Sequence, residues 1–101
     1  MSSLTKFDKQ YAKRRVAEKY QCILEEMAIG NRENGEDEYN VSEKQATIVL
    51  TRFYHDLWIH WHEKAFRYLS QGKDKKSDQA WEDCAKAIYA YYIVETKYKL
   101  C

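Results

Sequence analysis

The stretch YHDLWIHWHEK, residues 54–64, contains all three histidines of the chain and two of its three tryptophans. Within it, Asp56, His60 and Glu63 are spaced i, i+4 and i+7, so a helix would present them on one face. These side chains can bind a metal, and His60 with Glu63 reverses the Glu-x-x-His order of carboxylate di-iron bundles. Whether they form a metal site depends on the direction in which the helix points them.

Two considerations argue against a metal site: the direction in which these three side chains would point, and the lack of carboxylates from facing helices. If the apolar residues of the stretch face a core, Asp56 and Glu63 point towards solvent and His60 lies at the core margin. A di-iron site also needs carboxylates from facing helices, and we expect Glu25 and Glu26 at a different level of the bundle. We therefore predict no metal and no cofactor, with histidines that are solvated or hydrogen-bonded.

Residues for other kinds of catalysis are also missing. Cys22 and Cys84 fall on apolar stripes, where a free cysteine usually behaves as a small buried hydrophobe. Gly30, Gly35 and Gly72 mark helix ends or a loop, and they do not form a glycine-rich phosphate loop. We predict that the protein is not an enzyme.

The composition is that of one helical domain. The 101 residues leave room for a single core, and 45% hydrophobic with 33% charged residues is typical of globular proteins. The absence of proline favours long uninterrupted helices, because proline removes a backbone donor and clashes inside a helix. The formal net charge of +1 creates no overall field that would attract nucleic acid or an anionic membrane.

The cysteines and the lengths of the apolar runs indicate the cellular compartment in which the protein is expected. Three cysteines without a CxxC pair argue against a disulfide framework and against a zinc site of that spacing. The N-terminal residues lack the apolar stretch of a secretory signal, and no apolar run reaches the roughly 18 to 20 residues that span a bilayer. We expect a cytoplasmic protein that does not contact a membrane.

Apolar residues that recur at three- and four-residue steps predict three helices. We expect one helical domain, residues 1–101, composed of helix 1 at about 4–29, an acidic loop 30–41, helix 2 at about 42–71, a turn 72–77 and helix 3 at about 78–100. Gly30 and Gly72 should end the first two helices, and Ser42 with Gln45 fits a capping box at the start of the second. The predicted fold class is all-α, an antiparallel three-helix bundle with a long central helix.

The second helix carries a second seam of residues almost opposite its predicted core face. Its members follow steps of four and three residues, as in helix-to-helix packing, and they are Ile48, Arg52, His55, Ile59, His62 and Phe66. A three-helix bundle has no internal use for this seam, so we predict that it binds a protein partner or a second copy. The alternative is a set of scattered apolar surface residues, which are normal in soluble proteins.

Basic residues gather in two segments, and they are Lys6, Lys9, Lys13, Arg14 and Arg15 in helix 1 and Lys73, Lys75 and Lys76 at the turn before helix 3. In an up-down-up bundle these segments lie at the same end, which would then be basic. Such an end could contact a nucleic-acid backbone without sequence specificity. The alternative is a solvated face that maintains solubility, so nucleic acid is the secondary partner.

Two classes of function follow from these features. The first is a non-catalytic protein-interaction module, an adaptor or inhibitor that docks on a larger protein or nucleoprotein complex through the seam. Small aromatic-rich proteins of phage or mobile-element origin have this general architecture, which makes such an origin a hypothesis. The second is a small helical subunit of a nucleoprotein assembly that contacts the nucleic-acid backbone through its basic end. We favour the first.

Overall fold

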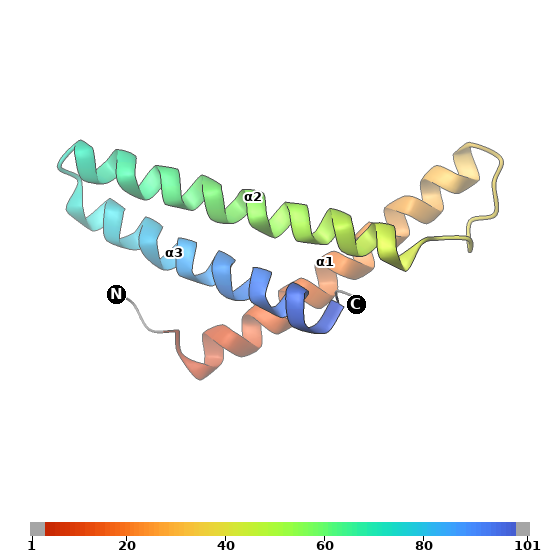
Figure 1. The fold of residues 1–101 in the computed structure, drawn as a ribbon, viewed down its shortest axis with the longest axis horizontal. Helices are drawn as coiled ribbons and strands as arrows, with labels where there is room; N and C mark the ends of the chain where they lie inside the picture. Colours follow the sequence, from red (N-terminus) through yellow and green to blue (C-terminus); the bar gives the residue numbers. More distant parts are fainter. Residues whose placement is uncertain (1–3, 99–101) are drawn as a thin grey trace.

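The computed structural model describes residues 4–98 and contains three α-helices within that range (Figure 1). They are α1 (Lys6–Glu33), α2 (Glu43–Ser70) and α3 (Asp74–Ile93), and a π-helical turn, η1 (Val94–Tyr98), continues α3. No strand occurs in residues 4–98. The prediction of an all-α fold with three helices is therefore confirmed, while the predicted end of helix 3 at residue 100 lies outside the described residues.

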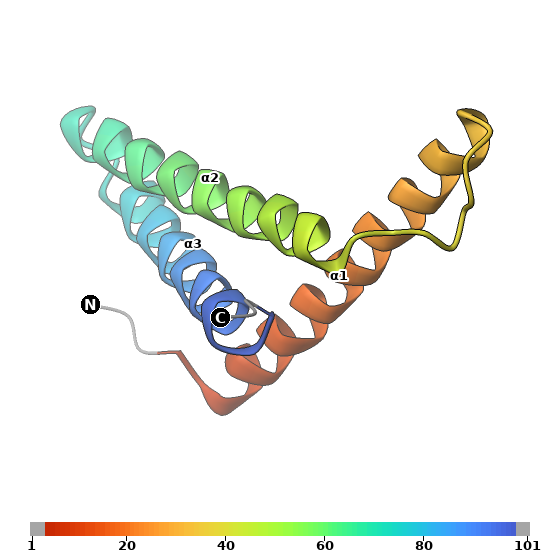
Figure 2. The ribbon, with the colours of Figure 1, turned by 45° about the vertical axis from the view of Figure 1, so that its right-hand side comes forward.

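The helices form a hairpin and a crossing helix. In Figures 1 and 2, α2 and α3 lie side by side and run in opposite directions, while α1 crosses them obliquely near the start of α2 and the end of α3. The result is an elongated molecule of 54 × 28 × 22 Å. The first helix does not run alongside the other two, as an up-down-up bundle would require. Its first and last turns instead project beyond the crossing.

Small residues hold α2 and α3 together. The side of α3 that packs on α2 carries a repeat of buried small residues at steps of three and four, namely Ser77, Ala80, Cys84, Ala87 and Ala90. Ala65 of α2 is also fully buried, and the hydroxyl of Ser77 donates a hydrogen bond to its carbonyl oxygen at 3.0 Å. Small side chains let two helix backbones approach closely, and larger ones are then displaced to either side of the contact.

The main core lies where the three helices cross. Val16 of α1, Leu50 of α2 and Val94 of η1 are completely buried there. The π-helical turn closes this core: the ring of Tyr98 lies 5.0 Å from that of Tyr20, and the Thr47 hydroxyl donates to the Tyr98 carbonyl oxygen at 3.2 Å. All three helices depend on this junction, because α1 has few buried residues elsewhere.

Side-chain caps define where the first two helices begin. The sequence TKFD forms a full capping box, in which the Asp8 backbone N–H donates to the Thr5 hydroxyl and the Thr5 backbone N–H donates to the Asp8 carboxylate. The Thr5 N–H holds the pKa of Asp8 below its usual range. The Ser42 hydroxyl accepts from the Gln45 N–H at 3.1 Å, which is one of the two hydrogen bonds of the capping box predicted at the start of α2.

The helix ends depart from prediction in two places. Gly72, with a φ of +73°, follows the end of α2 as expected, but Gly30 lies inside α1, which continues to Glu33. Gly35, with a φ of +75°, adopts the left-handed conformation in the turn that follows α1. Helix α3 begins at Asp74, whereas we predicted a turn to residue 77. The Ser77 backbone N–H donates to the Lys73 carbonyl oxygen at 2.9 Å, which places Ser77 in the first turn of the helix, and its hydroxyl bonds to α2 instead of capping α3.

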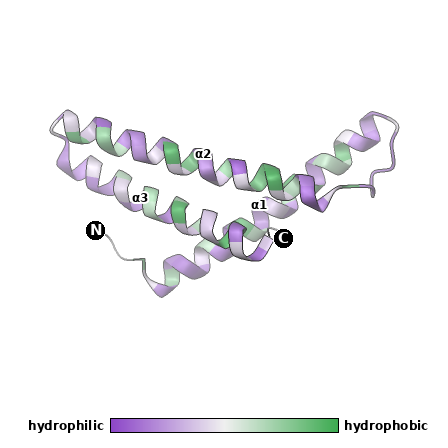
Figure 3. Cartoon of the chain, in the orientation of Figure 1, coloured by the Kyte–Doolittle hydropathy of each residue, from purple (hydrophilic) through white to green (hydrophobic). Residues whose placement is uncertain are grey.

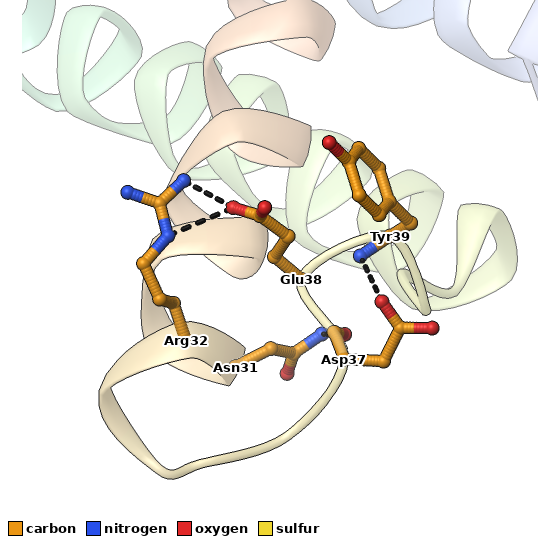
Figure 4. A network of polar contacts seen from close by, with 5 residues as sticks. All are labelled: Asn31, Arg32, Asp37, Glu38 and Tyr39. Carbon is orange, nitrogen blue, oxygen red and sulfur yellow. Dashed lines mark hydrogen bonds and ion pairs between the residues drawn. The ribbon is translucent and has the colours of Figure 1, made fainter.

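The acidic loop is tied to the last turn of α1 by side-chain contacts (Figure 4). The Asn31 side-chain amide donates to the carbonyl oxygens of Asp37 at 3.3 Å and Asn40 at 2.9 Å. Arg32 forms a salt bridge with Glu38, and the Tyr39 N–H donates to the Asp37 carboxylate at 3.0 Å. These bonds satisfy polar groups of a long connection and so favour one path for it.

The two described cysteines provide a test of the hairpin. Cys84 is 2% exposed and burial raises the pKa of its thiol, whereas Cys22 is exposed. Because the thiolate is the nucleophile, we expect iodoacetamide to modify Cys22 readily and Cys84 only after unfolding. Alkylation followed by peptide mass spectrometry, in buffer and in urea, measures both rates. Equal rates for the two thiols in buffer would show that α3 does not pack on α2 as described.

The same raised pKa predicts a pH dependence. The folded protein holds the Cys84 proton more tightly than the unfolded chain does, so this stabilisation is present below the ordinary pKa of about 9. It is lost as the pH rises through the raised pKa. The free energy of unfolding, measured by chemical denaturation, should therefore fall between neutral and alkaline pH. The fall should be smaller in Cys84→Ala, which lacks the titrating thiol.

Candidate functional site

Two of the three histidines belong to aromatic clusters that join α2 to α3. The ring of His55 lies 5.8 Å from Trp58 and 5.9 Å from Tyr91, and those two rings are 5.9 Å apart. About two turns further along α2, three other rings meet in the same way. The centroid distances are 4.9 Å for His62–Phe66, 5.4 Å for His62–Trp81 and 5.2 Å for Phe66–Trp81.

These clusters form one surface, which we call the aromatic face. It consists of His55, Trp58, Ile59, His62 and Phe66 of α2 with Trp81, Ile88 and Tyr91 of α3, and Ile48 and Arg52 extend it towards the start of α2. All six predicted seam residues are exposed. Three of them are large apolar side chains, at 39% for Ile48, 42% for Ile59 and 51% for Phe66.

The position of the seam was predicted wrongly in one respect. We expected it almost opposite the core and on α2 alone, but His55, His62 and Phe66 contact rings of α3. The reason is that α3 packs on α2 through small residues beside the seam. Trp81, Ile88 and Tyr91 are therefore site residues that we had not predicted as such. A signal for them exists in the sequence: the repeat of Ala, Ser and Cys in α3 marks the buried stripe and leaves the larger residues beside it.

A groove runs along the aromatic face between α2 and α3. It has a volume of about 940 Å³ and is lined by Trp58 and His62 on one side and by Trp81 and Ile88 on the other. Asp78 and Glu82 stand on the α3 rim. The lining includes no lysine, no arginine and no residue of α1.

A second groove lies on the other side of the hairpin, under the first turns of α1. Its volume is about 470 Å³, and its lining includes Phe7 and Tyr11 of α1 with Phe53, Leu57 and Trp61 of α2. It exists because α1 crosses the hairpin obliquely and leaves a wedge beside the crossing. On α2, Leu57 and Trp61 of the second groove lie about 100° around the helix from Trp58 and His62 of the first. The two grooves therefore flank the α2–α3 contact on different sides.

The third histidine lies apart from the aromatic face. The His60 ring contacts that of its neighbour Trp61, at 5.1 Å between centroids. In the described part of the chain, no three His, Cys, Asp or Glu side chains come together in a way that could hold a metal ion. The predictions of no metal, no cofactor and no enzymatic activity remain predictions.

The structure separates the two basic segments. Both are exposed, but α1 begins well away from the α2–α3 turn in Figures 1 and 2. The first turns of α1 are level with the middle and end of α3, where Lys9 lies 5.9 Å from the ring of Tyr89. At the turn, Lys73 and Lys76 lie about as far from the ring of Tyr68. The predicted single basic end is therefore wrong, because the crossing angle of α1 moves its start away from the turn.

Hydrophilic and hydrophobic segments alternate along all three helices (Figure 3). None of the helices within residues 4–98 has an apolar stretch that would let it cross a membrane. Comparisons of the chain with protein-family models, with curated proteins and with solved structures found no match. Function must therefore be argued from the surface itself.

Proposed function

We propose that the protein is a non-catalytic interaction module, an adaptor or inhibitor that docks on a larger protein or nucleoprotein complex through its aromatic face. The observation that carries this proposal is that large apolar and aromatic side chains stay exposed along one side of the α2–α3 hairpin. No helix of residues 4–98 covers that side, because α1 crosses the other one. Contiguous exposed apolar surface of this kind is typical of protein-binding sites.

The residue types on this face favour a protein as the partner. Tryptophan, tyrosine and arginine are enriched among the residues that dominate binding energy, and the face includes Trp58, Trp81, Tyr91 and Arg52. Ile59 is 42% exposed, so removing the rest of its side chain from water would contribute roughly half, or somewhat less, of the roughly 1.5 to 3 kcal/mol expected for a fully exposed isoleucine. The face rests on two packed helices, so little conformational entropy is lost when a partner binds.

The test is a pair of matched substitutions on α2. Ile59, 42% exposed, lies on the aromatic face, while Val49, 40% exposed, lies on another side of the helix. Ile59→Glu should weaken partner binding about tenfold or more, because it places a charge in a desolvated contact. Val49→Glu should have little effect, and neither change should lower the melting temperature much, since both sites are exposed.

The measurement is quantitative affinity capture from the native cell with tagged wild-type, Ile59→Glu and Val49→Glu proteins. Proteins lost from the Ile59→Glu sample and retained with Val49→Glu would then be tested by crosslinking from position 59. The proposal is wrong if the two variants retain the same proteins as wild type. It is also wrong if captured proteins crosslink equally from Glu25, an exposed residue of α1 that does not belong to the aromatic face.

A further inference from the structure

The groove on the aromatic face is suited to a cationic partner with aromatic anchors. Its rim carboxylates, Asp78 and Glu82, are exposed and follow each other by one turn of α3, with Asp74 one turn earlier. Neither rim carboxylate lies within 4.0 Å of a basic group in residues 4–98. Tryptophan rings in the lining add faces over which a lysine or arginine can pack.

The first turns of α1 have the complementary chemistry. Phe7 is 73% exposed and Tyr11 is 47% exposed, and their rings stack at 6.5 Å. Arg14 lies 5.2 Å from the Tyr11 ring, so the three residues form an exposed stripe at i, i+4 and i+7 along one edge of α1. This is the spacing by which a helix inserts anchors into a groove. The exposed basic residues around the stripe are Lys6, Lys9, Lys13 and Arg15.

This stripe cannot reach the groove of its own chain. Phe7, Tyr11 and Arg14 line the groove on the opposite side of the hairpin, and no α1 residue lines the groove on the aromatic face. The crossing core formed by Val16, Leu50 and Val94 fixes α1 on that side. The basic stripe and the acidic groove can therefore meet only between two molecules.

We infer that the first turns of α1 of one copy dock in the acidic groove of a second copy, with Phe7 and Tyr11 against Trp58 and Trp81. This inference rests on the proposed function, because it takes the aromatic face to be a binding surface and names an occupant for its groove. The contact is head-to-tail, so a pair of copies keeps one free groove on one molecule and one free stripe on the other, and further copies can add to both ends. Attraction between Arg14 and the rim carboxylates is screened by salt, so association weakens as ionic strength rises.

Two variants each remove one half of the contact. Asp78→Lys with Glu82→Lys reverses the groove rim, and Phe7→Glu with Arg14→Glu reverses the stripe; all four sites are exposed. Each variant alone should associate at least about tenfold more weakly than wild type, because like charges then face each other. Glu25→Lys with Glu33→Lys makes the same charge change as the groove variant at exposed sites in the second half of α1, which line neither groove, and should associate like wild type.

Mixing the two variants gives the decisive result. The groove variant has an intact stripe and the stripe variant has an intact groove, so a mixture should form a 1:1 complex that grows no further. Sedimentation equilibrium of the purified full chains at low and high salt measures this, with circular dichroism to check helix content. The inference is overturned if wild type stays monomeric at low salt, if the groove variant associates like the Glu25/Glu33 control, or if the mixture stays monomeric.

The failure of this inference can be distinguished from the failure of the proposed function. If captured proteins depend on Ile59 while the purified protein is monomeric, the inference falls and the proposed function stands. If the mixture forms its complex but no other protein depends on Ile59, the adaptor proposal falls and the groove is a self-association site.

Discussion

Replacing Leu50 with alanine should destabilise the protein by about 2–5 kcal/mol, the range for deleting a large aliphatic side chain from a well-packed core. Leu50 is completely buried at the point where α1, α2 and the end of α3 meet. Its side chain packs in the junction on which the position of α1 depends, so the cavity left behind cannot be filled by a simple shift of one helix. For a domain of about 100 residues, each kcal/mol lowers the melting temperature by roughly 4–8 °C.

Urea unfolding followed by circular dichroism measures the change, with Val49→Ala as the neighbouring control. Val49 is 40% exposed, so its truncation should alter the free energy of unfolding by no more than about 0.5 kcal/mol. The urea concentration at the unfolding midpoint should fall for Leu50→Ala, while the slope of the free energy of unfolding against urea stays the same. A loss of less than 1 kcal/mol, as for a surface site, would contradict a core centred on the crossing.

Enlarging Ala80 to leucine should destabilise the protein by about 1–3 kcal/mol through overpacking. Ala80 is 2% exposed and lies between Ser77 and Cys84 in the small-residue stripe of α3. A leucine there must either adopt a strained rotamer or push α3 away from α2. The second outcome would also lengthen the Ser77–Ala65 hydrogen bond, now 3.0 Å.

Gln79→Leu is the matched control, because it adds a leucine to the same turn of α3 at an exposed position. Chemical unfolding of the two variants compares their stabilities, and alkylation of Cys84 in buffer reports whether α3 has moved. We expect Ala80→Leu to be less stable and its Cys84 to react faster, with neither change in Gln79→Leu. Equal stability of the two variants would mean that the helices are not held together by small residues at this level.

The helices themselves were predictable because their signals are local. Three- and four-residue periodicity, the serine before α2 and the glycine after it each act within a turn or two of chain, and α2 spans Glu43–Ser70 against a prediction of about 42–71. The exposure of Ile48, Ile59 and Phe66 was predictable for the same reason, since it follows from their angle around one helix.

Other local signals were ambiguous until the tertiary contacts were known. Gly30 has the same local chemistry as Gly72, but α1 continues through it and turns only at Gly35. Loop residues such as Asp37 and Asn40 bond to Asn31, beyond Gly30, and these contacts extend the helix past the glycine. Ser77 resembles a helix cap, yet its hydroxyl bonds to Ala65 of the neighbouring helix. In each case a contact outside the helix itself, six to twelve residues away in the sequence, outweighed a local preference of about 1 kcal/mol.

The arrangement of the helices was decided by the tertiary structure alone. Periodicity identifies which side of a helix is apolar, but it does not tell which apolar side chains face which helix or at what angle the helices cross. Helix α3 packs on α2 through alanine, serine and cysteine, so the half-buried Trp58, Trp81 and Tyr91 lie beside the contact and form part of the aromatic face. The oblique crossing of α1 separates Lys9 from Lys73 and leaves the opposite face of the hairpin uncovered, because one helix on a narrow hairpin can cover only one side.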